Sequence, residues 1–147
     1  MKINLQYLAI VGVLSLIGLA PAARAASLQV TAQIPFDFVV NNQKLSAGEY
    51  NLKSLSQSAI LLQDEDRQQT VIVLAHSAES NSNPEGAKLV FNKYGDQYFL
   101  SQIWPGFSDS GQQLPESRLE REVMHGKAPQ HISLLLGKSG TMEISKK

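Results

Sequence analysis

The chain has 147 residues, with 13 basic side chains, 13 acidic side chains and no cysteine. A formal net charge of +0 argues against a nucleic-acid-binding protein, which normally carries a basic surface. The lack of cysteine excludes disulfides, thiol chemistry and a lipid anchor on an N-terminal cysteine.

The first 25 residues have the pattern of a secretory signal peptide. Lys2 precedes an apolar run at 8–20, and Ala23 and Ala25 provide a cleavage site of small residues. A membrane span needs about 20 apolar residues, so we expect cleavage after Ala25 rather than an uncleaved anchor. The mature chain, 26–147, would then be secreted or periplasmic, without a membrane span, and long enough for a single domain with its own core.

Strict alternation predicts a strand over residues 28–40, where each even position is apolar. Pro35 interrupts this pattern, and proline cannot donate to a strand ladder. The strand should therefore lie at an edge there or divide into two. Asn41-Asn42 predicts a tight turn, and 45–55 a further extended segment.

Two more strands are expected at 59–63 and 70–76, joined by a polar turn at 64–67. Three of the four turn residues are acidic, and carboxylates of this kind often bind calcium. The EF-hand spacing is absent, because no glycine follows at the sixth position and no glutamate at the twelfth. We interpret the turn as solvated, and the Ser-, Asn- and Pro-rich segment 77–87 as a flexible loop.

The segment 88–104 predicts a hairpin with its two-residue turn at 95–96. The expected cross-strand pairs include Phe91 with Leu100 and Leu89 with Gln102. Both faces of this hairpin carry large apolar groups, so both should be covered. A second sheet and a C-terminal helix are the candidates.

A short helix is expected after a loop at 105–113. Pro115 suits a first turn, and Ser117 with Glu120 forms a capping box. Gly126 is expected to end the helix. A helix of about ten residues is too short to be stable alone, so it must pack on the sheet.

Alternation at 132–136 predicts a last strand or an extended tail, and 137–147 is expected to be frayed. Together these segments predict an all-β fold. We expect a single antiparallel sandwich or partly open barrel of about six to eight strands, with one short C-terminal helix.

The sequence carries no recognisable catalytic or metal-binding motif. His76, His125 and His131 lack the spacing of a zinc site. Asp37 and Glu49 could face each other across the first hairpin, but nothing fixes a catalytic separation. We therefore expect no enzymatic activity, no metal and no cofactor.

Four aromatic residues, Tyr94, Tyr98, Trp104 and Phe107, lie close together in the sequence. They are candidates for a ligand or partner surface, where Tyr and Trp are enriched. The competing interpretation is that they are core residues, which is more usual for aromatics on the strands of a small β domain.

Several segments of the chain resemble a family of small secreted β-rich proteins common in acidobacteria. The resemblance is carried by residues 34–38, 45–50, 88–104 and 114–117, and it covers most of the mature chain. Ser46 departs from the family pattern, where a proline would be expected. The family has no assigned activity, so the resemblance implies export and a β fold and brings no catalytic residues.

The function expected from these observations is an exported, non-enzymatic structural or interaction module of the cell envelope or extracellular space, with a protein partner. An alternative is a carrier that holds a small apolar ligand between sheet and helix, near Tyr98, Trp104 and Val123. A second alternative is a secreted enzyme of unrecognised type, which would require polar side chains to converge in one site. The sequence leaves the oligomeric state open.

Overall fold

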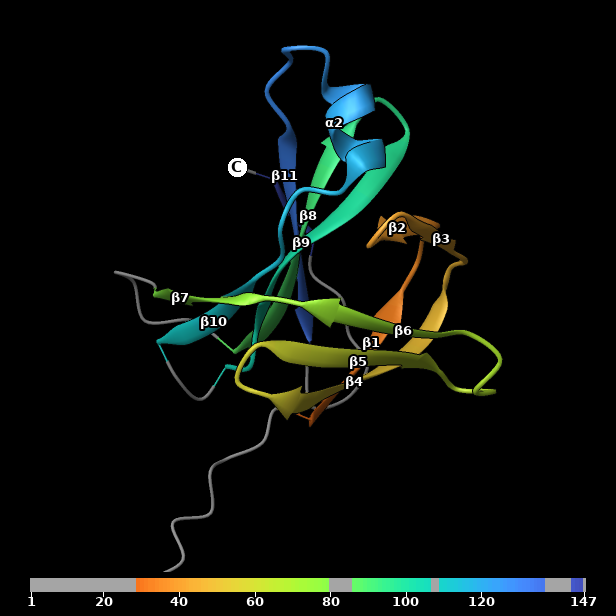
Figure 1. The fold of residues 1–147 in the computed structure, drawn as a ribbon, viewed down its shortest axis with the longest axis vertical. Helices are drawn as coiled ribbons and strands as arrows, with labels where there is room; N and C mark the ends of the chain where they lie inside the picture. Colours follow the sequence, from red (N-terminus) through yellow and green to blue (C-terminus); the bar gives the residue numbers. More distant parts are fainter. Residues whose placement is uncertain (1–28, 80–85, 107–108, 137–143, 147) are drawn as a thin grey trace, which may run out of the picture.

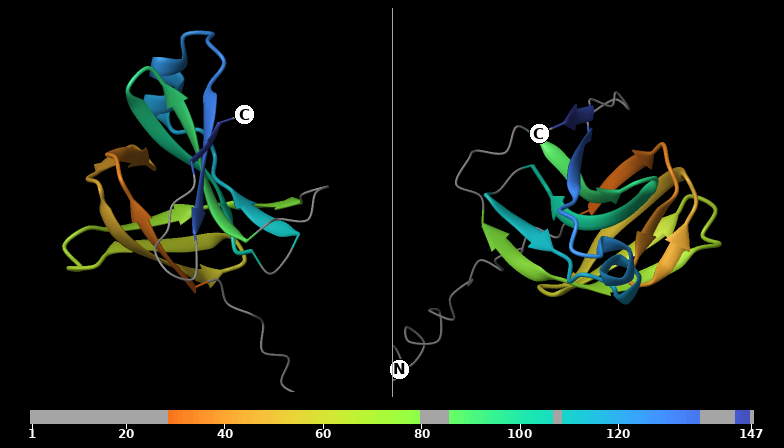
Figure 2. Two further views of the ribbon diagram at one scale, coloured as in Figure 1. Left: turned by 180° about the vertical axis from the view of Figure 1, so that it is seen from behind. Right: turned by 90° about the horizontal axis from the view of Figure 1, so that it is seen from above.

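A computed structural model describes residues 29–79, 86–106, 109–136 and 144–146. This part of the chain forms two β-sheets and one short helix, which confirms the predicted all-β class (Figure 1). The four-stranded sheet crosses the long strands of the other sheet at a steep angle, as two further views show (Figure 2). The predicted signal peptide lies outside the described residues.

The four-stranded sheet is antiparallel and has the order β1-β4-β5-β6. Its strands are β1 (Gln29–Ile34), β4 (Gly48–Ser56), β5 (Ala59–Asp64) and β6 (Thr70–Leu74). Strands β1 and β6 are therefore its two edges.

The second sheet has eight strands and is built on the β8–β9 hairpin. Its main order is β12-β11-β8-β9-β10-β7, and β2 and β3 join it beside β9. The strands are β2 (Phe38–Val40), β3 (Gln43–Leu45), β7 (His76–Glu79), β8 (Ala87–Tyr94), β9 (Gln97–Trp104), β10 (Ser110–Gln113), β11 (Gln130–Leu136) and β12 (Ile144–Lys146).

The strand predicted over 28–40 is divided into two strands around Pro35, which was one of the two predicted outcomes. β1 ends at Ile34 in the four-stranded sheet, and β2 begins at Phe38 in the other sheet. The predicted turn at Asn41-Asn42 is confirmed. Both residues have positive φ, 47° and 64°, as a two-residue hairpin turn requires.

The β8–β9 hairpin is confirmed, but its predicted register holds only near the turn. Phe91 pairs with Leu100 as expected, whereas Leu89 pairs with Ile103 and not with Gln102. The register shifts between Val90 and Phe91, because β9 accommodates one extra residue as a bulge.

Three strands lie in segments that were expected to be loop or tail. All of β7 except its first residue, His76, falls in the predicted loop 77–87, and β10 falls in the predicted loop 105–113. They pair with each other, and neither shows a run of alternating apolar residues that would have marked it as a strand. β12 pairs with β11 within the expected frayed tail, while 137–143 lies outside the described residues. The described part of the chain therefore has twelve short strands, more than the six to eight expected.

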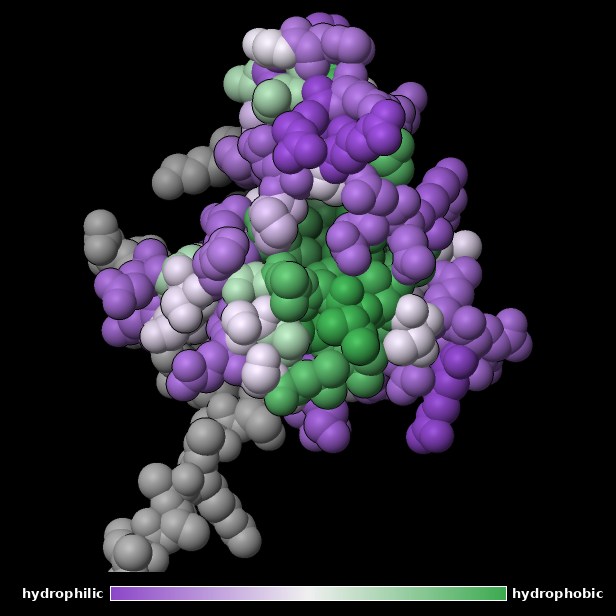
Figure 3. Space-filling view, viewed as in Figure 1, coloured by the Kyte–Doolittle hydropathy of each residue, from purple (hydrophilic) through white to green (hydrophobic). Residues whose placement is uncertain are grey.

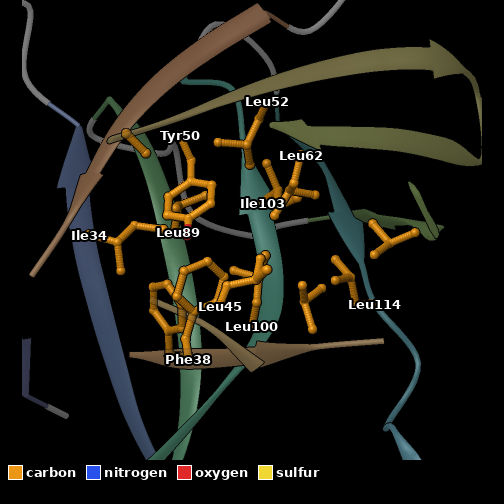
Figure 4. Packing of buried hydrophobic residues seen from close by; sticks show 14 of the residues in the cluster. Ile34, Phe38, Leu45, Tyr50, Leu52, Leu62, Leu89, Leu100, Ile103 and Leu114 are labelled. Atoms are coloured by element: carbon orange, nitrogen blue, oxygen red, sulfur yellow. The ribbon is translucent and has the colours of Figure 1, made fainter. Parts of the chain in front are cut away.

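The main hydrophobic core lies between the two sheets, and Figure 4 shows its side chains pointing toward one another. Aromatic rings from both sheets meet edge to face in it. The ring centroids of Phe38 and Tyr50 are 5.2 Å apart, and those of Phe38 and Phe91 are 5.7 Å apart. Phe36 adds a third such contact, 5.1 Å from Phe91.

The helix α2 (Arg118–Met124) covers part of the other face of the hairpin, as the apolar residues on both faces predicted. Val123 and Met124 pack against a second cluster formed by Val39, Tyr94 and Phe99. The Ser117 hydroxyl accepts a hydrogen bond from the Glu120 amide at 3.1 Å, which confirms the predicted cap.

Candidate binding groove

A groove with an apolar floor and polar side chains from the β2–β3 turn and α2 opens between β6, this turn and the start of α2. We call it the β6–α2 groove. Its hollow measures about 300 Å³, and its apolar lining consists of Val39, Val40, Ile72, Val73, Leu74, Phe99, Leu100, Leu114 and Pro115. Figure 3 shows hydrophobic surface gathered on this face of the molecule, with hydrophilic surface around it.

The exposed large hydrophobic side chains of the groove belong to β6. Val71 and Val73 are buried in the core, and the alternation of the strand turns Ile72 and Leu74 outward. Their exposed fractions are 54% and 68%. Large apolar side chains that lie together in water mark an interaction surface more often than isolated ones do.

The backbone of β6 contributes a second feature to the groove. β6 pairs with β5, and the Ala75 amide just beyond it donates to the Ser58 carbonyl at 2.9 Å. Because hydrogen-bonded and non-bonded pairs alternate in an antiparallel ladder, the N–H and C=O groups of Ile72 and Leu74 face away from β5. Within the described residues no strand pairs with that side of β6. The groove therefore contains an open strand edge.

The Asn41-Asn42 turn connects the two walls of the groove. The Asn41 side-chain amide donates to the Ile72 carbonyl of β6 at 3.4 Å, which is a long contact. The Asn42 side-chain oxygen accepts a hydrogen bond from the Leu119 amide of α2 at 3.1 Å. The turn thus fixes the separation of β6 and α2.

We expect Asn42→Gly and Asn42→Ala to destabilise the protein by different amounts. Both remove the hydrogen bond to α2, at about 1 kcal/mol. Alanine should add about 1 kcal/mol, because it tolerates the positive φ less well than glycine. Urea unfolding measures both changes, and Gln43→Ala on the neighbouring exposed position is the control. Equal effects of glycine and alanine would contradict this role of the turn.

A buried carboxyl group lies behind the α2 wall. Glu120 is only 3% exposed, and its Oε1 accepts a hydrogen bond from the Asn92 side-chain amide at 2.8 Å. The Asn92 oxygen is 3.0 Å from Nδ1 of His131. Since an amide oxygen can only accept, His131 donates from Nδ1. The three side chains form one hydrogen-bonded chain from β11 through β8 to α2.

Burial raises the pKa of the Glu120 carboxyl above its ordinary value. The hydrogen bond from Asn92 opposes this rise, and the negative charge of Glu116 adds to it. Burial also raises the pKa of the Tyr94 hydroxyl, with a further contribution from the charges of Glu120 and Glu116. Negative charge is therefore disfavoured at the buried Glu120 and Tyr94 side chains between α2 and β8.

Three of the four predicted aromatic residues lie within the described residues, and these three occupy different places in the fold. Tyr94 is buried beside Phe99 under α2, with the two ring centroids 5.9 Å apart. Tyr98 is half-buried and stacks on Phe36, with centroids 3.9 Å apart. Phe107 lies outside the described residues. None of the described three lines the β6–α2 groove.

Trp104, the remaining aromatic of that set, is buried at the other end of the hairpin. Its indole N–H donates to the Gln102 side chain at 3.0 Å, and the Lys88 ammonium lies 5.6 Å from the ring centroid. Its role in the described structure is packing.

The ionisable residues considered for catalysis lie in separate elements. Asp37 precedes β2, Glu49 lies in β4, His76 in β7, and His125 at the C-terminal cap of α2. The Ala47 amide and the Lys44 ammonium lower the pKa of Asp37. Across the described ranges, no group of three or more His, Cys, Asp or Glu side chains could hold a metal ion.

The groove was not predicted from the sequence, although one signal for it was present. Residues 71–74 read Val-Ile-Val-Leu, which is apolar on both faces of the strand. Such a run indicates either burial on both sides or an exposed apolar face. The sequence alone does not distinguish the two, because β6 is recognised as an edge only from the sheet order.

No protein-family model matches the chain, and no curated protein or solved structure matches it either. In the part of the chain that the structure describes, no helix is long and apolar enough to cross a membrane. Function must therefore be inferred from the groove itself.

Proposed function

We propose that the chain is an exported, non-enzymatic interaction module whose β6–α2 groove holds an extended segment of a protein partner in the cell envelope or extracellular space. One observation carries this proposal. Ile72 and Leu74 have exposed apolar side chains, and their backbone groups face an open strand edge, except for the Ile72 carbonyl, which accepts a long hydrogen bond from Asn41.

An extended polypeptide matches both properties of this edge. It can add a strand to β6 through backbone hydrogen bonds and place alternate side chains on the apolar lining. A small apolar ligand would cover the side chains and leave the backbone groups without new partners. The combination therefore favours a peptide segment.

The charges on the α2 wall indicate what the partner segment should carry. Arg118 and Arg121 line the groove from the exposed side of α2. The carboxylate of Glu120 is instead directed to Asn92 and away from solvent. Glu116 lines the same wall and Arg118 already pairs with Glu122 at 2.8 Å, so an acidic residue of the partner would be attracted mainly to Arg121.

Export is supported by the signal-peptide pattern of residues 1–25 and by the resemblance to small secreted β-rich proteins. Mass spectrometry of the mature protein from the exported fraction tests it, and a chain that begins at Ala26 is the expected result. A full-length chain that stays in the cytoplasm would contradict export.

Peptide selection tests the binding proposal. A library of linear decapeptides displayed on phage is panned against the mature chain, and the affinity of selected peptides is measured by calorimetry. We expect alternating apolar sequences that bind at least about tenfold more weakly to Leu74→Lys, a loss of about 1.4 kcal/mol. Leu55→Lys is the matched control, since Leu55 is 50% exposed but lies on β4 and outside the groove lining.

Two results would contradict the peptide-binding proposal. One is that no peptide is enriched over panning on the support alone. The other is that selected peptides bind the Leu74→Lys and Leu55→Lys variants equally well, which would place their site outside the groove. The melting temperature of each variant is recorded, so that a folding defect is not mistaken for a binding defect.

The second candidate function is a carrier of a small apolar ligand. The hollow of about 300 Å³ beside α2 supports it, because ligand pockets begin near this size. Tyr98, Trp104 and Val123, the residues first considered for such a site, do not line it. Native mass spectrometry of the exported protein distinguishes the two functions. Retained extra mass that Leu74→Lys removes would favour the carrier, and a bare chain would count against it.

A further inference from the structure

We infer that protonation of Glu120 controls how firmly α2 is held against the eight-stranded sheet, and so regulates the α2 wall of the β6–α2 groove. The consequence for partner binding rests on the proposed function, whereas the response of α2 itself does not.

The position of α2 depends on a small number of contacts. The helix has only seven residues, too few to be stable without tertiary packing. Val123 and Met124 pack on the cluster that contains Tyr94 and Phe99. The Asn42 side-chain oxygen accepts a hydrogen bond from the Leu119 amide. Glu120 contributes a buried side-chain hydrogen bond to β8. A change in the energy of that contact should therefore change how firmly the helix is held.

The groups that face Glu120 compensate its charge only in part, through hydrogen bonds from the Asn92 side chain and the Ser117 backbone amide. Asn92 and Tyr94 approach from β8, and both are uncharged at neutral pH. His131 on β11 reaches Asn92 and not the carboxylate itself. Glu116, which precedes the helix, carries the same sign of charge as Glu120.

The two arginines of α2 are engaged elsewhere. Arg118 pairs with Glu122 at 2.8 Å on the exposed side of the helix. Arg121 donates to the Glu116 carbonyl at 3.4 Å. In the described structure neither forms an ion pair with the Glu120 carboxylate, so a buried negative charge remains without a cationic partner.

The sign of the effect follows from where the proton binds more tightly. In the docked helix the pKa of Glu120 is raised, mainly by burial. In a displaced helix the carboxyl is in water and has its ordinary pKa. Protons therefore favour the docked helix. The packing of α2 on the sheet should strengthen as the pH falls from the raised pKa toward the ordinary pKa. It should weaken as the pH rises through the same interval.

The hydrogen bond to Asn92 survives protonation, because the carbonyl oxygen of a neutral carboxylic acid still accepts from the Asn92 amide. Protonation thus removes the buried charge without removing the contact. Since α2 forms one wall of the groove, we expect the groove to be held more firmly in mildly acidic solution than at neutral pH.

NMR on the mature chain without any partner tests the inference. The side-chain carboxyl carbon of Glu120 is titrated, and amide hydrogen exchange over 118–124 is followed with pH and corrected for intrinsic rates. We expect protection of α2 to increase on acidification, by about tenfold for each unit that separates the docked and ordinary pKa values. The change should be absent in Glu120→Gln, which keeps an acceptor for Asn92.

Glu122→Gln is the control for a charge change on the exposed face of α2, and it should keep the wild-type pH response. Two results would overturn the inference. One is that Glu120 titrates at its ordinary pKa in the folded chain. The other is that Glu120→Gln retains the pH response of α2.

Binding of the selected peptides separates this inference from the proposed function. If peptides bind, their affinity for the wild-type chain should rise on acidification, and their affinity for Glu120→Gln should not change with pH. If no peptide binds but α2 responds to pH as described, the proposed function fails and the role of Glu120 stands. If peptides bind with the same pH dependence in both chains, the role of Glu120 fails and the proposed function stands.

Discussion

Phe91→Ala is expected to lower the free energy of unfolding by about 3–5 kcal/mol, the usual cost of truncating a buried phenylalanine. Phe91 is fully buried between the sheets and contacts the rings of both Phe36 and Phe38. It also lies on β8, which pairs with β9 on one side and β11 on the other. A cavity at this point cannot close without moving the central strands of the larger sheet.

Denaturant unfolding followed by circular dichroism measures the Phe91 effect. Phe91→Leu keeps most of the side-chain volume and should cost less than about 1.5 kcal/mol. A loss below about 1 kcal/mol for Phe91→Ala would contradict the packing of the core between the two sheets.

Gly111→Ala is expected to produce the second large effect, a loss of about 1–3 kcal/mol from overpacking. A Cβ atom at Gly111 would lie 2.5 Å from the nearest ring atom of Trp104. Because Trp104 is buried on β9, the indole must move outward or β10 must separate from β9. The single tryptophan makes the change visible, since its fluorescence should shift to longer wavelength as the ring becomes more hydrated.

Gly48→Ala is the matched control for Gly111→Ala. A Cβ atom at Gly48 would lie 3.9 Å from the Tyr50 ring, which is an ordinary van der Waals contact. The control should therefore leave stability within about 0.5 kcal/mol of the wild type. If Gly111→Ala behaves like Gly48→Ala, the close approach of β10 to Trp104 is not present in solution.

The elements that could be predicted from the sequence are those with a clear local pattern, such as alternating burial along a strand or residue types that favour a turn. β1 alternates between core and solvent, and the Asn41-Asn42 turn needs positive φ, so both could be located from residue types alone. The capped helix after Pro115 was found for the same reason, although it begins at Arg118. In each case local chemistry and tertiary structure agree.

The register of the β8–β9 hairpin and the strands β7 and β10 could not be predicted in the same way. A bulge is set by how two strands fit their neighbours, and the residues around Val90 carry no glycine that would mark one. β7 and β10 are polar strands that are held by pairing with each other. Their stability comes from contacts far apart in the sequence.

The candidate site was missed because it depends on sheet order. Residues 71–74 were recognised as a strand, but nothing in them indicates which strands lie beside them. The aromatic residues proposed as a surface are instead divided between different parts of the fold, with Tyr94 under α2 and Trp104 against Gly111.

Amide hydrogen exchange of the wild-type chain, with and without a selected peptide, tests most directly whether the β6–α2 groove accepts an added strand. We expect the amides of Ile72 and Leu74 to become protected on binding, because they face the open edge of β6. The amides of Val71 and Val73 already face β5 and should change little. A peptide that binds tightly yet leaves Ile72 and Leu74 unprotected would contradict strand addition at this edge.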